Sequence, residues 1–162
     1  MATKKKSKKA AAKSAARKPK KAAPKKRRAA AAKPAWKLDG VAPSITANDL
    51  EKSLAWYRTV GFTLVEPFER DGKMVGGQLK AGNVVFLIGQ DDWQKGRDRK
   101  KGEGFRLYLM TTGDIDALAK GIVARGGRLD QPPTDQPWGM RDFSMTDPDG
   151  FKITFAKDTT KR

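Results

Sequence analysis

Two side chains near the C-terminal end of the chain, Trp138 and Arg141, have the chemistry of ligand recognition. An indole can stack on a planar molecule, and a guanidinium can hold a carboxylate or stack in turn. A second interpretation stays open, in which Trp138 fills the core and Arg141 pairs with Asp142 or a neighbouring acid. The variant Trp138→Ala distinguishes the two interpretations. A core Trp changed to Ala typically costs about 3–5 kcal/mol of stability, whereas a Trp at the wall of a pocket should cost less.

The chain has no histidine and no cysteine, and this absence limits its chemistry more than any motif does. Imidazole is the commonest general base and transition-metal ligand near neutral pH, and cysteine supplies disulfides and thiolate zinc sites. A metal site would therefore have to use Asp, Glu, Gln or backbone oxygens. We expect no metal and no other cofactor, and we assign no catalytic residue.

The positive charge of the chain is concentrated at one end. Of its 35 Lys and Arg residues, 16 lie within residues 1–37, which contain no Asp or Glu, so residues 38–162 hold 19 basic against 18 acidic groups. This segment is rich in Ala, Lys and Pro, and its only bulky apolar residue after Met1 is Trp36. Because it cannot bury enough surface to offset its ordering entropy, we predict a disordered basic arm over 1–37 and one folded domain over 38–162.

The arm predicts non-specific binding to nucleic acid. Clustered lysines release counterions from a phosphate backbone without reading its sequence. Its composition resembles the tails of linker histones and of bacterial nucleoid proteins with histone-like extensions. We expect a cytoplasmic protein that is associated with the nucleoid if it is bacterial. The alternatives are a solubilising or nuclear-localisation-like extension, an anionic membrane surface or an acidic protein partner. The expected phosphate contacts are Lys4, Lys5, Lys6, Lys8, Lys9, Lys20, Lys21, Lys25, Lys26, Arg27 and Arg28.

The domain repeats one order of elements. A strand is expected at 42–46, then a helix capped by Asn48 and ended by Gly61, then a strand from 62 to 65 and a hairpin before 84–88. The same order returns with a strand at 105–110, a helix that begins at Asp114 and ends before 126–127, and a hairpin before 151–155. The sequence predicts an α+β fold of two β-α-β-β-β modules, at about 41–90 and 105–157, joined by a loop over 91–104. No stretch approaches the length of a membrane span.

Two segments of the domain carry recognisable motifs. They are Asp49-Leu50-Glu51-Lys52-Ser53-Leu54-Ala55-Trp56-Tyr57 and Pro137-Trp138-Gly139-Met140-Arg141-Asp142-Phe143, the latter followed by Asp147-Pro148-Asp149-Gly150-Phe151-Lys152-Ile153. With these motifs the chain resembles the vicinal oxygen chelate superfamily, which includes glyoxalase I, extradiol dioxygenases and bleomycin-resistance proteins. The resemblance spans about residues 41–157. It implies paired modules whose curved sheets enclose a pocket, with Trp138 and Arg141 at the pocket wall.

The same resemblance implies where metal-dependent members carry their ligands. Those positions fall at Ala42, at or beside Phe86, near Leu107 and at Thr154. None of these is a metal ligand of the family type, so metal-dependent lyase or dioxygenase activity is not expected. The expected ligand-binding residues are Trp138, Arg141, Gln78, Phe86 and Thr154.

Three functions fit the sequence. The first is a metal-free small-molecule-binding protein of the glyoxalase and bleomycin-resistance type, held on nucleic acid by its arm. The second is a metal-independent glyoxalase-like enzyme that uses a carboxylate such as Asp142 for proton transfer. The third is a nucleoid architectural protein whose domain forms a homodimer and whose pocket is occluded. The loop around Trp93 is expected to be exposed and to cover either the pocket or a dimer contact.

Overall fold

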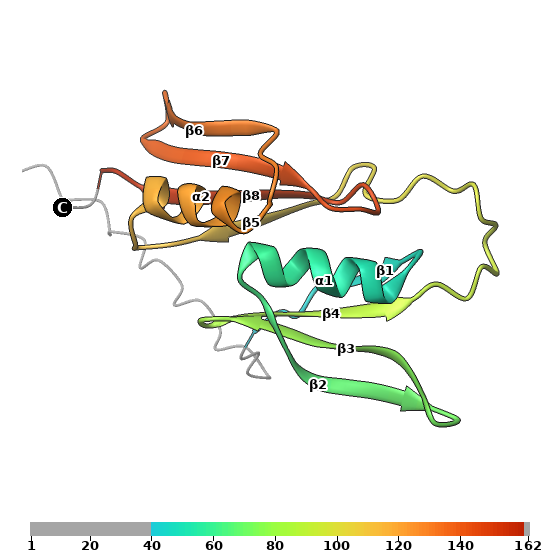
Figure 1. Cartoon of the computed structure of the whole chain (residues 1–162). Helices are drawn as coiled ribbons and strands as arrows, with labels where there is room; N and C mark the ends of the chain where they lie inside the picture. The colour runs from blue at the N-terminus through green and yellow to red at the C-terminus, as the bar shows by residue number, and fades with distance from the viewer. Residues whose placement is uncertain (1–39, 161–162) are drawn as a thin grey trace, which may run out of the picture. The chain divides into compact units, whose positions relative to one another are not determined.

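The structure is a computed structural model that describes residues 40–160, which fold into two modules of the same design (Figure 1). The predicted basic arm lies outside these residues. Module one contains β1 (Ser44–Ala47), α1 (Leu50–Val60), β2 (Thr63–Arg70), β3 (Lys73–Ala81) and β4 (Val84–Gln90). Module two contains β5 (Arg106–Met110), α2 (Ile115–Ala124), β6 (Gln131–Gln136), β7 (Met140–Thr146) and β8 (Lys152–Asp158).

The predicted pairing of β-α-β-β-β modules is confirmed. Each module forms one four-stranded sheet, with strand orders β1-β4-β3-β2 and β5-β8-β7-β6. In both sheets the first strand runs parallel to the last, and the remaining neighbours are antiparallel. Each helix connects the first strand to the second and packs on its own sheet, so one face of each sheet is covered and the other has no helix on it.

Helix α1 begins one residue later than its sequence pattern indicates. Asp49, rather than Asn48, is the N-cap, and its carboxylate accepts a hydrogen bond of 3.0 Å from the backbone N–H of Lys52. Asn48 instead donates its backbone N–H to Asp149 over 2.7 Å. Gly61 ends the helix as expected, since its φ of 107° lies in the left-handed region that side chains with a Cβ rarely adopt.

Helix α2 has the N-cap that the sequence predicts. The carboxylate of Asp114 accepts hydrogen bonds of 3.0 Å from the backbone N–H groups of Asp116 and Ala117. The helix stops at Arg125, just before Gly126. Ile115, Ala119 and Ile122 form its buried stripe at the three- and four-residue spacing of an amphipathic helix.

One hydrophobic core contains residues of both modules, and Tyr57 of α1 is central to it. The Tyr57 ring is fully buried and makes edge-on contacts with Trp56, Phe62 and Phe86 at centroid distances of 4.9, 6.0 and 5.0 Å. Its hydroxyl donates to Asp147, 90 residues along the chain, over 2.8 Å. Tyr57 therefore packs on aromatic rings of module one and donates a hydrogen bond to module two.

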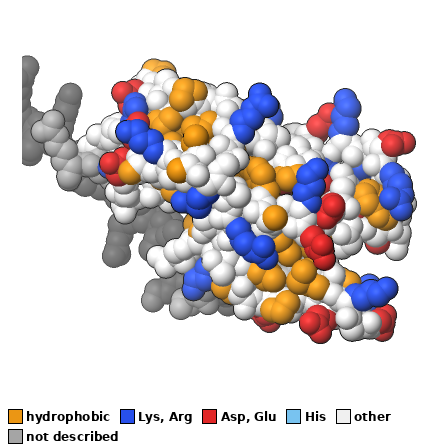
Figure 2. Space-filling view, in the orientation of Figure 1, with side chains coloured by type: hydrophobic (Ala, Val, Ile, Leu, Met, Phe, Trp, Pro, Cys, Tyr) orange, Lys and Arg blue, Asp and Glu red, His pale blue; other side chains and the backbone are white. Residues whose placement is uncertain are grey.

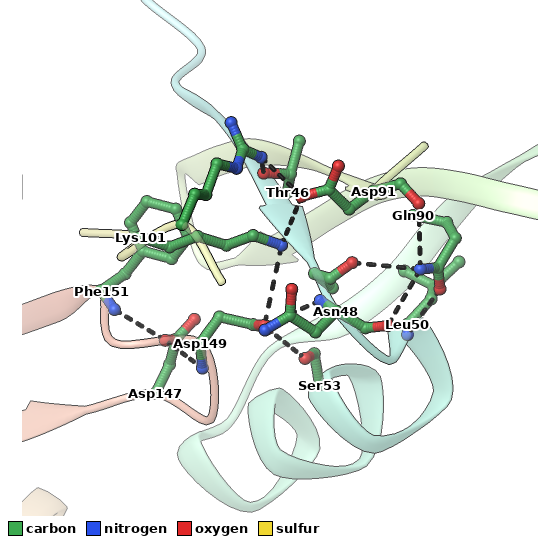
Figure 3. A network of polar contacts seen from close by, with 12 residues as sticks. Thr46, Asn48, Leu50, Ser53, Gln90, Asp91, Lys101, Asp147, Asp149 and Phe151 are labelled. Carbon is green, nitrogen blue, oxygen red and sulfur yellow. Dashed lines mark hydrogen bonds and ion pairs between the residues drawn. The ribbon is translucent and has the colours of Figure 1, made fainter. Parts of the chain in front are cut away.

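The turn between β7 and β8 anchors module two to α1 (Figure 3). Asp147 accepts hydrogen bonds from the backbone of Asp149 and Phe151, which fixes the turn, and from Tyr57. Asp149 accepts from the Ser53 hydroxyl over 2.8 Å. The sequence predicted that these acids shape the turn, and the structure adds that both also bind the helix of the other module.

A buried ion network fixes the loop between the modules. Asp91 lies 2.6 Å from the Arg99 guanidinium and 2.8 Å from the Lys101 ammonium, and these cations keep its pKa below the usual range. The Lys101 side chain, only 3% exposed, also lies 4.0 Å from Asp149 (Figure 3). The Trp93 ring is covered by the Arg97 guanidinium at 4.5 Å from its centroid. This loop is therefore tied to both modules at its charged side chains.

Charge is mixed on the surface of the domain. On the face shown in Figure 2, basic and acidic side chains alternate with apolar groups. This agrees with the near balance of basic and acidic groups in residues 38–162. Neither helix in the described part of the chain is long and apolar enough to span a membrane.

We expect Tyr57→Phe to lower the free energy of unfolding by about 1–3 kcal/mol, the usual effect of leaving a buried polar group without its partner. Burial raises the pKa of Asp147, and the Tyr57 hydrogen bond partly opposes that rise. A carboxyl whose pKa is raised in the folded state contributes stability below its unfolded pKa, and this stability is lost as the pH rises through the folded pKa. Removal of the Tyr57 hydroxyl raises the folded pKa of Asp147 further, because that hydroxyl favours the ionised carboxylate. The loss of stability in Tyr57→Phe should therefore be larger at pH 7 than at pH 4.

Tyr108→Phe is the matched control, because Tyr108 is 46% exposed. Urea unfolding of both variants at the two pH values makes the comparison. Equal small losses for the two variants would show that the contact between Tyr57 and Asp147 contributes nothing measurable.

Candidate ligand-binding site

The face of the β5-β8-β7-β6 sheet that is turned away from α2, called here the open face, carries polar and aromatic side chains. Leu107 and Ile153 alternate to the other side, where they join the core. Tyr108 pairs with Thr154 across β5 and β8, and Thr154 pairs with Ser144 across β8 and β7. These three residues therefore form one cross-strand row on the open face.

A groove of about 350 Å³ lies over this row. Strands β5, β6, β7 and β8 all contribute to it, together with the turn between β6 and β7. Its lining residues are Arg106, Tyr108, Gln131, Gln136, Trp138, Asp142, Ser144 and Thr154.

Two hydrogen bonds hold the polar floor of the groove. The Gln136 side-chain amide donates to the carboxylate of Asp142 over 2.9 Å. The Arg106 guanidinium donates to the hydroxyl of Thr154 over 2.6 Å. Asp142 and Thr154 are buried although they lie on the open face, so their neighbours shield them. The groove is therefore built from side chains that already have fixed partners.

Trp138 lies at the rim of the groove with 64% of its surface exposed. It occupies the turn between β6 and β7, beside Gly139, whose positive φ of 80° forms the tight bend. No other aromatic ring of the described residues contacts its indole. A large exposed apolar ring at the edge of a polar groove is available for stacking on a ligand.

Arg141 lies on the other side of the sheet from the groove. Its guanidinium makes a two-pronged ion pair with Asp116 of α2, at 2.9 and 2.8 Å, and a third contact of 3.0 Å with Asp135. These contacts raise the pKa of Arg141 and lower that of Asp116. This geometry corresponds to the alternative in which Arg141 forms ion pairs. The ion pair with Asp116 ties α2 to its sheet. The structure does not bring Arg141 together with Trp138, which lines the groove.

The two predicted residues of module one occupy opposite faces of its sheet. Phe86 is 1% exposed and packs on Tyr57 and Phe62 on the α1 side. Because side chains alternate along a strand, the residue on the helix-free face is the neighbouring Leu87, which pairs with Gln78. Phe86 therefore lies in the core, whereas its neighbour Leu87 and the predicted Gln78 lie on the helix-free face.

The residues present do not fit a divalent transition metal. At the positions implied by the family, the helix-free faces present Leu87 in β4, Arg106 and Tyr108 in β5, and Thr154 in β8, while Ala42 precedes β1. Three or four imidazole, thiolate or carboxylate ligands are needed. Within residues 40–160, no three His, Cys, Asp or Glu side chains are grouped so that they could hold a metal ion.

A second, larger groove of about 750 Å³ lies where the two modules meet. It is lined mostly by apolar groups from the end of α1, the β3–β4 turn and the end of β5, including Phe62, Val84 and Leu109. It is mostly apolar, whereas the open face has hydrogen-bonded polar pairs on its floor. The groove on the open face is therefore the better candidate for specific recognition.

Residues 37–155 match the model of the Glyoxalase/Bleomycin resistance protein/Dioxygenase superfamily. The match covers well over half of the sequence, and the chain belongs to this superfamily. No curated protein matches the sequence.

Several solved structures have the same fold. One is a member of this superfamily from Sphaerobacter thermophilus, with 29% identity, a TM-score of 0.57, and coverage of 74% of this chain and 98% of that chain. Another is a bleomycin-binding protein complexed with bleomycin, with 19% identity, a TM-score of 0.58 and the same coverage. A third is a bleomycin resistance determinant encoded on the transposon Tn5, with 19% identity, a TM-score of 0.59, and coverage of 75% and 98%.

Sequence reasoning missed part of the groove. Arg106, Tyr108, Gln136 and Ser144 were not among the expected ligand-binding residues. A signal for two of them exists in β5, where Arg106 and Tyr108 alternate with apolar residues over residues 106–110. Gln136 carries no such signal, because its place depends on the path of β6.

Proposed function

We propose that this protein binds a small molecule, without a metal, on the open face of the second sheet. The observation that carries the proposal is the groove itself, in which the exposed rings of Tyr108 and Trp138 stand beside a hydrogen-bonded polar floor. Small-molecule sites generally combine apolar or aromatic walls with a few placed polar groups. The bleomycin complex of a protein with the same fold supports the choice of a binding function.

A second copy of the chain would complete the site. The groove is open to solvent, and a sheet face without a helix exposes Tyr108 and Met110 at 46% and 56%. A ligand held on such a face would keep one side in water unless another surface covered it. The helix-free face of β1-β4-β3-β2 in a partner copy, with Gln78 and Leu87 upon it, is the cover that we propose. This makes the protein a homodimer with two such sites.

The basic arm would hold this binding domain on nucleic acid. Its 16 basic residues without an acidic residue support polyanion binding, while the domain is close to neutral. Tethering raises the local concentration of the binding site at the nucleic acid. The proposal places the protein in the cytoplasm, associated with the nucleoid in a bacterium.

A thermal-shift screen of the full chain tests the binding function. We expect planar organic compounds to raise the melting temperature, since a ligand at 100 times its dissociation constant stabilises the native state by about 2.7 kcal/mol. Zinc, nickel and iron should give no comparable shift, and elemental analysis after dialysis should find no stoichiometric transition metal. A tightly held metal, or the absence of any hit that depends on Trp138, would contradict the proposal.

A metal-independent enzyme is the second candidate, and the carboxylate of Asp142 in the groove favours it. Asp142 is 7% exposed and its carboxylate accepts a hydrogen bond from Gln136, so this carboxylate is held in place at the floor of the groove. An Asp142→Asn variant distinguishes the candidates. A binding protein should lose little more than a hydrogen bond, whereas an enzyme should lose its turnover.

A further inference from the structure

The open face has a basic end. Arg106 and Lys152 begin β5 and β8 and lie directly opposite each other in the register of the two strands. Both side chains are exposed, and both alternate to the same side as Tyr108 and Thr154. Arg106 also lines a neighbouring groove of about 450 Å³, which is bounded by the loop at Lys101–Phe105, by Gly150 and by Lys152. The two grooves therefore meet at Arg106.

These two cations have no acidic partner among residues 40–160. Glu103 lines the neighbouring groove but lies 3.7 Å from Lys100, and the carboxylates nearest to Lys101 are Asp91 and Asp149. Arg106 uses one of its N–H groups on the Thr154 hydroxyl and keeps the rest of its guanidinium for another partner. The only carboxylate in the groove over the sheet is Asp142, which is buried and already hydrogen-bonded.

The aromatic side chains of the groove lie next to this basic end. Tyr108 is two residues from Arg106 on the same face of β5, a separation of about 6.6 Å along a strand. Trp138 lines the same groove from the turn between β6 and β7. A guanidinium pairs well with planar oxyanions, and exposed rings stack on flat molecules.

We propose that the ligand is a flat aromatic molecule that carries an oxyanion, either a carboxylate or a phosphate. The oxyanion lies at Arg106 and Lys152, and the rings of the ligand stack on Tyr108 and Trp138. This inference rests on the proposed binding function of the open face and adds the charge and shape of what it binds. A cationic ligand would face two unpaired cations at this end of the groove, and it is therefore disfavoured.

Matched probes test the charge of the ligand on the full chain. The probes are 2-naphthoate, 2-naphthyl phosphate and 2-naphthylmethylammonium, which share one ring system and differ in the charged group. We expect each anionic probe to bind at least about tenfold more tightly than the cation, which corresponds to about 1.4 kcal/mol. The tighter of the two anions identifies the oxyanion as a carboxylate or a phosphate.

Paired variants test the location. Arg106→Gln and Lys152→Gln should each weaken binding of the anionic probes about tenfold. Arg128→Gln removes the same charge from an exposed arginine outside both grooves and should leave binding unchanged. Any anion binding by the basic arm is common to all variants and cancels in the comparison.

The outcomes separate this inference from the function on which it rests. If the cation binds as tightly as the anions and Trp138→Ala weakens its binding, the binding face stands and the anionic ligand class is wrong. If Trp138→Ala changes the binding of no probe, or if no probe binds, both the face and the ligand class are contradicted. Equal effects of Arg106→Gln and Arg128→Gln would also overturn the assignment.

Discussion

Removal of residues 1–37 is expected to abolish binding to double-stranded DNA at moderate salt, while the full chain binds without sequence preference. If about half of the 16 basic groups of the arm meet phosphates, log K should fall with log salt with a slope near −7. A slope of this size corresponds to a loss of roughly four orders of magnitude in affinity between 50 and 200 mM salt. Fluorescence anisotropy of a labelled duplex at several salt concentrations provides the measurement.

Two controls accompany this experiment. The truncated chain should keep the urea midpoint of the full chain, which would show that the loss of DNA binding is not a loss of the domain. A second duplex of unrelated sequence should bind the full chain equally well. Equal affinity of the truncated and full chains would place nucleic-acid binding in the domain and remove the function proposed for the arm.

Trp138→Ala should weaken the binding of 2-naphthoate about tenfold and leave the stability of the fold nearly unchanged. The indole is 64% exposed, so truncation removes little buried surface, whereas a core Trp typically costs about 3–5 kcal/mol. The loss of affinity follows from the loss of a stacking surface at the rim of the groove. Urea midpoints and ligand titrations on the same protein samples provide the two values.

Trp56→Ala and Arg141→Lys are the matched controls for this result. Trp56 packs against the core from α1, and Arg141 pairs with Asp116 on the side of the sheet away from the groove. Both variants should lower the urea midpoint and keep the affinity for 2-naphthoate. A large loss of stability in Trp138→Ala with unchanged affinity would make Trp138 a structural residue.

The order of elements could be predicted from the sequence because it depends on local signals. Asp114 has the side chain of an N-cap, and Gly61 can adopt the left-handed conformation that ends α1. The repeat of these signals in both halves then predicts two modules of one design. A wrong assignment at Asn48 moved the cap by one residue without changing the helix, because helix ends are set by neighbouring groups that compete for the same role.

The site could be predicted less well, because its residues depend on register and on partners far away in the chain. In β4 of the first sheet, a shift of one residue puts Phe86 in the place of Leu87 and moves a side chain from the helix-free face to the core. Arg141 forms an ion pair with Asp116, 25 residues away in the chain, and no sequence motif predicts this pairing. Strand β6 contains Pro132 and Pro133. These prolines are tolerated because β6 is an edge strand with an irregular register.

Two-dimensional ¹H–¹⁵N NMR of the full chain with the compound that gives the largest thermal shift tests the central claim most directly. We predict that the largest ligand-induced shifts lie in β5, β6, β7, β8 and the β6–β7 turn, and that they include the indole N–H of Trp138. Smaller shifts at Gln78 and Leu87 should accompany them, because that face of a second copy covers the ligand. The indole N–H groups of Trp56 and Trp93 serve as internal references, since neither residue lines this groove. Shifts centred instead on Phe62, Val84 and Leu109, with the Trp138 indole unmoved, would place the ligand in the groove where the modules meet and contradict binding on the open face.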